Sequence, residues 1–127
     1  MDFATVIPNP QPDAIAPDGS EVRLLGGVAG GTMASFTLPA GTCSMAVTHR
    51  KIEELWVVVS GAGQMWRKQG DREEITDLVP GMGLSIPLDT HFQFRAAPDV
   101  AFVAVGVTMP PWSGHNEAIP VEGPWKA

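Results

Sequence analysis

Short runs of alternating apolar and polar residues make up most of this chain. In residues 32–38, for example, the apolar side chains share one face and the intervening serine and threonine share the other, as in a half-buried β-strand. Glycine and proline separate these runs, and no stretch of ten or more residues between them keeps a helical period. The predicted strands cover residues 20–25, 32–38, 43–49, 54–60, 64–68, 74–79, 83–86, 92–96 and 100–108. Short strands at this spacing predict an all-β sandwich or barrel.

Proline-rich segments flank the predicted strands. We therefore predict an extended N-terminal arm over residues 1–19, a barrel over residues 20–108 and an extended C-terminal arm over residues 109–127. The C-terminal arm has two interpretations, a strap across a barrel or a lid over the barrel mouth that carries His115. The strap is favoured because rigid prolines make poor hinges.

Residues 100–108 are apolar on both faces of their predicted strand. A strand of this kind needs a cover on its outer side as well as on its inner side, and either a second sheet or a partner subunit would supply it. We expect a homodimer.

Composition narrows the class of protein. The chain has 127 residues, enough for one domain, and 44% of them are hydrophobic and 17% charged, as in a compact globular protein. A net charge of −6 argues against binding to nucleic acid. A single cysteine excludes an internal disulfide, and the N-terminal segment lacks a basic residue before Arg23, so no secretory signal is expected. Residues 100–107 are too short an apolar stretch to span a membrane, and we expect a cytoplasmic protein.

One pair of polar residues lies on strands that are otherwise apolar. Because side chains alternate along a strand, Met45, Val47 and His49 are expected on one face. Glu54 and Trp56 share a face of the next predicted strand, and antiparallel pairing of the two strands would place His49 beside Glu54 inside the barrel.

The spacing of these residues resembles the first motif of the cupin superfamily. That motif reads glycine, five residues, His-x-His, three or four residues, glutamate, six residues, glycine. Here Gly41, His49, Glu54 and Gly61 match, and Val47 replaces the first histidine.

A second motif of the same family follows further along the chain. Pro87 matches, Asp89 takes the glycine position, Phe92 takes the histidine position, and Arg95 or a neighbour takes the asparagine position. The resemblance covers residues 20–108. It implies a double-stranded β-helix, the jelly-roll-like barrel of cupins, and it leaves the activity open because one fold hosts many chemistries.

The metal-binding cupins hold their ion with three histidines and one glutamate, of which only His49 and Glu54 are present here. Two protein ligands rarely hold a divalent ion tightly, so no metal or other cofactor is expected. The resemblance instead implies a pocket for a small, partly apolar molecule, with His49 and Glu54 as its polar anchor or as an acid–base pair. The expected lining is Met45, Val47, His49, Glu54, Trp56, Phe92 and Phe94.

Two alternatives remain open. The chain could be a metal-dependent isomerase, lyase or dioxygenase that uses His49, Glu54 and either His91 or His115. A one-residue offset turns His91 to the wrong face, however, unless a bulge near residues 89–90 restores it. It could also be a structural or effector-sensing module without chemistry, in which His49 and Glu54 only fix the strand register and the interior is packed.

Overall fold

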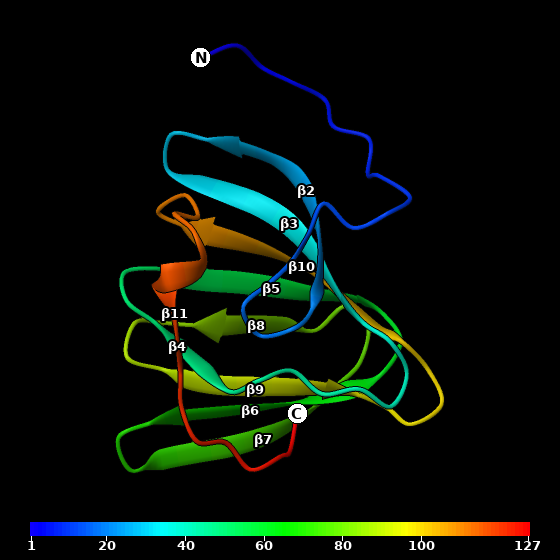
Figure 1. Cartoon of the computed structure of the whole chain (residues 1–127), viewed down its shortest axis with the longest axis vertical. Helices are drawn as coiled ribbons and strands as arrows, with labels where there is room; N and C mark the ends of the chain where they lie inside the picture. The colour runs from blue at the N-terminus through cyan, green and yellow to red at the C-terminus, as the bar shows by residue number, and fades with distance from the viewer.

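The chain forms two antiparallel β-sheets that face each other (Figure 1). The computed structural model describes the backbone of residues 1–127 and every side chain except that of His115. In this described part, no helix is long and apolar enough to cross a membrane. The elements are β1 (Ala14–Ile15), β2 (Glu21–Val28), β3 (Gly31–Leu38), β4 (Val47–His49), β5 (Glu53–Ser60), β6 (Gly63–Gln69), β7 (Arg72–Leu78), β8 (Gly83–Ile86), β9 (His91–Ala96), β10 (Phe102–Met109), the 3₁₀ turn η1 (His115–Glu117) and β11 (Ala118–Pro120).

Strands β1 to β3 lie together in one sheet, and from β3 onward the chain changes sheet at every step except that from β6 to β7. One sheet has the order β1-β2-β3-β10-β5-β8, and the other has the order β11-β4-β9-β6-β7. The chain therefore crosses the barrel repeatedly, from β3 to β4, from β4 to β5 and from β5 to β6, which is jelly-roll connectivity. The predicted all-β barrel is confirmed.

The core lies between the two sheets, where the alternation places it. Along β10, buried and half-buried residues alternate strictly, so that Phe102 and Ala104 face inward. The opposite sheet contributes Met65 and Phe94, neither of which has any exposed surface. The aromatic rings interlock edge to face across the interior, with Phe94 and Phe102 5.9 Å apart.

The second sheet covers only the inner side of β10. The valines on its outer side stay half-buried. Next to them, Leu55 and Val57 of β5 pair with Val107 and Val105 and are about half exposed. The sequence allowed either a second sheet or a partner subunit to cover the outer side of this strand. The second sheet does not cover that side.

The strand predicted over residues 43–49 is the main departure from the expected pattern. Only Val47–His49 forms β4, and Cys43 makes an isolated bridge to Arg95. Ala46 and Val47 are both buried, which breaks the alternation. As a result Met45, expected to point into the barrel, lies on the surface with 42% of its area exposed.

The terminal segments are more structured than extended arms. In the N-terminal segment, β1 pairs with β2, and the backbone N–H of Met45 donates to the carbonyl of Asp18. In the C-terminal segment, β11 pairs with β4 and extends the five-stranded sheet.

Beyond β11 the C-terminal tail, red in Figure 1, runs across the five-stranded sheet. The side chain of Gln93 points away from the core and is still buried, because it exchanges hydrogen bonds with the backbone of Trp125 (2.8 and 3.2 Å). Arg95 stacks on the Trp125 ring at 4.2 Å. These contacts are those of a strap. The lid interpretation depended on His115, whose side chain lies outside the described residues.

Candidate functional site

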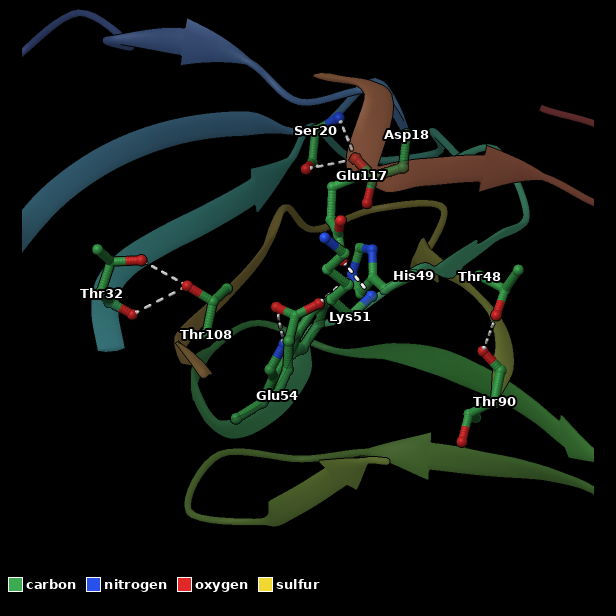
Figure 2. Close-up of polar contacts among 11 residues, drawn as sticks. Asp18, Ser20, Thr32, Thr48, His49, Lys51, Glu54, Thr90, Thr108 and Glu117 are labelled. Carbon is green, nitrogen blue, oxygen red and sulfur yellow. Dashed lines mark hydrogen bonds and ion pairs between the residues drawn. The ribbon is translucent and has the colours of Figure 1, made fainter. Parts of the chain in front are cut away.

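His49 and Glu54 meet inside the barrel as a hydrogen-bonded pair. Their side chains are only 7% and 4% exposed, and His49 Nε2 lies 2.5 Å from Glu54 Oε2 (Figure 2). The second oxygen of Glu54 accepts a hydrogen bond from Trp56 Nε1 at 3.1 Å. The sequence placed this pair on two hydrogen-bonded strands, whereas β4 and β5 belong to different sheets. The pair therefore links the two sheets across the interior, at the point where the chain crosses between them.

This network determines which nitrogen of His49 carries the proton. Glu54 Oε1 accepts from Trp56 Nε1, and an ionised Glu54 also accepts at Oε2, so we assign Nε2 of His49 as the nitrogen that donates. In a neutral imidazole Nδ1 is then an acceptor. This atom is buried and has no hydrogen-bond partner among the described residues. An acceptor left unsatisfied in a buried position typically costs about 1–3 kcal/mol.

A cavity of about 130 Å³ lies against this pair. Five of the residues predicted to line the pocket do so: Val47, His49, Glu54, Trp56 and Phe92. The other two do not. Phe94 lies behind Trp56, with ring centroids 4.9 Å apart, and belongs to the packed core. Met45 lies on the outer surface because of the broken alternation before β4.

Much of the cavity wall comes from segments that sequence reasoning did not include. Phe36 of β3 stacks on Trp56 at 5.1 Å with an angle of 21° between the rings. Gly106 allows this stack, since a Cβ there would lie 2.8 Å from both rings. On the other side, Trp112 of the C-terminal segment packs edge-on against His49 at 5.5 Å. The tryptophan content of the tail was the only sequence signal for this contact.

The N-terminal segment supplies residues 14–18 to the wall, including Asp18. Ala16 to Gly19 form a turn in which Gly19 N–H donates to the Ala16 carbonyl and Gly19 has a φ of 96°. The sequence Pro-Asp-Gly is typical of such turns. A turn of this kind is local, and nothing in the sequence indicated that it closes the barrel.

The environment of Asp18 favours its neutral form. Burial is the largest influence and raises the pKa of this carboxyl above its ordinary value of 3.8. Two hydrogen bonds from Ser20 to Oδ1, from N–H at 2.9 Å and from Oγ at 2.7 Å, act in the opposite direction. The nearby Glu54 raises the pKa further, and His49 lowers it only in its protonated form.

The residues present do not fit the metal site that the two cupin motifs describe. Val47 and Phe92, at two of the histidine positions, are direct cross-strand partners, and both are buried apolar side chains. His91 pairs in register with Lys68 of β6, and its side chain lies on the opposite face of β9 from that of Phe92. No bulge in this pairing turns it inward. Among the side chains that the structure describes, no three His, Cys, Asp or Glu residues come together as a metal-binding group. The side chain of His115, the other proposed ligand, is outside that set.

No family model matches this sequence, and no curated protein sequence matches it. Solved structures do resemble it. A cupin protein from Bacteroides fragilis is 26% identical, with a TM-score of 0.58 over 65% of this chain and 68% of its own. KdgF from Halomonas sp. is 17% identical, with a TM-score of 0.64 over 72% of this chain and 81% of its own.

CapF from Staphylococcus aureus is also 17% identical, with a TM-score of 0.69 over 92% of this chain. This chain spans only 34% of CapF. The sheet order, the strand crossings and these likenesses agree with the two sequence motifs: the chain has the fold of the cupin superfamily.

Proposed function

We propose that this protein binds a small, mostly apolar molecule in the barrel cavity, with His49 as the polar anchor and Glu54 as the residue that positions it. One observation carries the proposal: Nδ1 of His49 is a buried acceptor without a partner, in a side chain that lines an otherwise largely apolar cavity. A hydrogen-bond donor brought in by a ligand would remove the cost of leaving this acceptor unsatisfied.

The size and lining of the cavity define the class of ligand. Its volume of about 130 Å³ is close to the roughly 150 Å³ of an engineered apolar protein cavity that binds benzene. The walls are mainly aromatic and aliphatic, and Trp56 and Phe92 meet edge to face at 6.5 Å. A ring of about six atoms with one hydroxyl or N–H group matches this lining.

The His49–Glu54 pair and the cavity beside it also distinguish the alternative functions, which are acid–base catalysis, a structural module and a metal-dependent enzyme. A carboxylate that holds an imidazole in one tautomer also prepares Nδ1 to accept a proton, so acid–base chemistry on a bound ligand would use the same two residues. A purely structural module predicts a filled interior, and the cavity beside His49 favours binding instead. The metal-dependent alternative lacks a suitable set of described ligands.

Phenol is a suitable probe, and Trp56 and Trp112 report on it by fluorescence because both line the cavity. The test compares the wild type with His49→Phe, which keeps a ring but removes the acceptor. His91→Phe on the outer face of the sheet is the matched control. We expect wild type and His91→Phe to bind phenol alike and His49→Phe to bind it about 5- to 10-fold more weakly, while benzene binds all three equally. Equal phenol affinity in all three proteins would exclude His49 as the anchor, and no binding of either probe to folded wild type would refute the binding function.

A further inference from the structure

Asp18 is a further polar residue of the cavity wall, and it has no counterpart in the motifs of the barrel. Figure 2 shows its carboxyl group between Ser20 and His49. Oδ1 accepts both hydrogen bonds from Ser20. Oδ2 accepts no hydrogen bond from the described residues. One oxygen is therefore held by the turn, and the other remains available beside the cavity.

The charges around Asp18 determine what this oxygen can do. Glu54 of β5 and Glu117 of η1 are both buried carboxyl groups on the elements that face Asp18 (Figure 2), and His49 of β4 is the third titratable neighbour. No lysine or arginine is among the described residues that line the cavity. Protonation of Asp18 is favoured, because its carboxylate has no lysine or arginine beside it and lies close to a second carboxylate. Because Oδ1 accepts from Ser20, the proton belongs on Oδ2, where it makes a hydrogen-bond donor.

We propose that Asp18 is the second polar anchor of the cavity, and that the cavity takes an uncharged alcohol or phenol whose hydroxyl donates to His49 Nδ1 and accepts from the Asp18 carboxylic acid. This rests on the proposed binding function of the same cavity. A hydroxyl group is both donor and acceptor, so one such group on an apolar ring satisfies the acceptor of His49 and the donor of Asp18 together. Anions are rejected, because they would enter beside two carboxyl groups with no cation in the wall.

The test uses phenol and pyrrole as probes. Phenol donates and accepts, whereas pyrrole donates one N–H and its nitrogen accepts nothing. Asp18→Asn keeps an oxygen for Ser20 and presents an N–H₂ donor that does not titrate. Asp18→Leu removes the donor, and Asp13→Asn, at an exposed carboxylate of the same segment, is the control. We expect Asp18→Leu to weaken phenol binding about 5- to 10-fold and to leave pyrrole binding unchanged.

The pH profile separates this role from a structural one. Wild type is expected to lose phenol affinity as the pH rises through the raised pKa of Asp18, since deprotonation removes the donor, and Asp18→Asn is expected to lack this loss. Asp18→Asn carries no titratable group at this position, so the difference between the two profiles belongs to Asp18.

Identical pH profiles for wild type and Asp18→Asn would overturn the role of Asp18, as would equal losses of phenol and pyrrole in folded Asp18→Leu. In either case phenol still binds wild type, and the proposed function stands. Failure of the proposed function is a different result, in which folded wild type binds neither probe.

Discussion

Replacing Glu54 is the most direct test of the network at the centre of the barrel. In Glu54→Leu, the buried donors His49 Nε2 and Trp56 Nε1 both lose their acceptor. Leaving one partner of a buried polar pair unsatisfied typically costs several kcal/mol, and we expect a loss of about 3–5 kcal/mol in the free energy of unfolding. For a domain of this length, 1 kcal/mol corresponds to roughly 3–5 °C in Tm, so the expected fall is about 10–25 °C.

Glu54→Gln tests the same network more finely. Trp56 Nε1 is only a donor, so the amide oxygen must face Trp56, which turns the NH₂ group toward His49. His49 then has to accept at Nε2 and carry its proton on Nδ1. The Trp56 hydrogen bond survives, and we expect a smaller loss of about 1–2 kcal/mol, or about 3–10 °C in Tm.

Two measurements check these expectations. Chemical denaturation gives the free energies of unfolding, with Glu122→Gln as an exposed control. Imidazole ¹⁵N chemical shifts identify the tautomer of His49, and the chain has only 3 histidines to assign. A stable Glu54→Leu variant, or a His49 that keeps its proton on Nε2 in Glu54→Gln, would refute the proposed hydrogen-bond network.

Two further predictions concern pH and assembly. Burial raises the pKa of Asp18 in the folded protein, so its contribution to stability is fully present below its unfolded pKa of about 3.8 and is lost as the pH rises through the folded pKa. Urea unfolding at about pH 4, 6 and 8 should therefore show wild type losing stability relative to Asp18→Asn as the pH rises, and a difference that is constant with pH would contradict this. The homodimer stays a prediction, and we propose that it forms through the outer face of β5 and β10, where Leu55, Val57 and Val59 are about half exposed. Light scattering after size-exclusion chromatography should then give a dimer for wild type and for Ile75→Lys on β7, and a monomer for Val57→Lys, whereas a wild-type monomer at every concentration would exclude this interface.

The two-residue period of the sequence predicted the all-β class, and the resemblance to the two cupin motifs predicted the barrel. Alternation in residues 54–60 recurs in the burial of β5, and the spacing from Gly41 to Gly61 placed the turn between His49 and Glu54. The same period put Phe92 inside and His91 outside, as the register of β9 shows. These properties are local, because side-chain direction along a strand depends only on the backbone of that strand.

The boundaries of the cavity depended on contacts between distant parts of the chain. Alternation failed for Met45, since the strand that would have carried it does not begin until Val47. The sequence joined His49 and Glu54 correctly as neighbours but placed them on paired strands, whereas they bridge two sheets. Asp18 and Trp112, near opposite ends of the chain, reach the same cavity, and no local pattern signals this.

The sequence by itself therefore determined the all-β class and the inward direction of most of its strand residues, and its resemblance to the cupin motifs implied the barrel and the loss of two metal ligands. Only the tertiary structure decided that a cavity remains, that Nδ1 of His49 lacks a partner, and that Asp18 lies nearby. The physical reason is that strand period and turn chemistry act over a few residues, while closure of a cavity depends on which segments, far apart along the chain, pack across the barrel mouth.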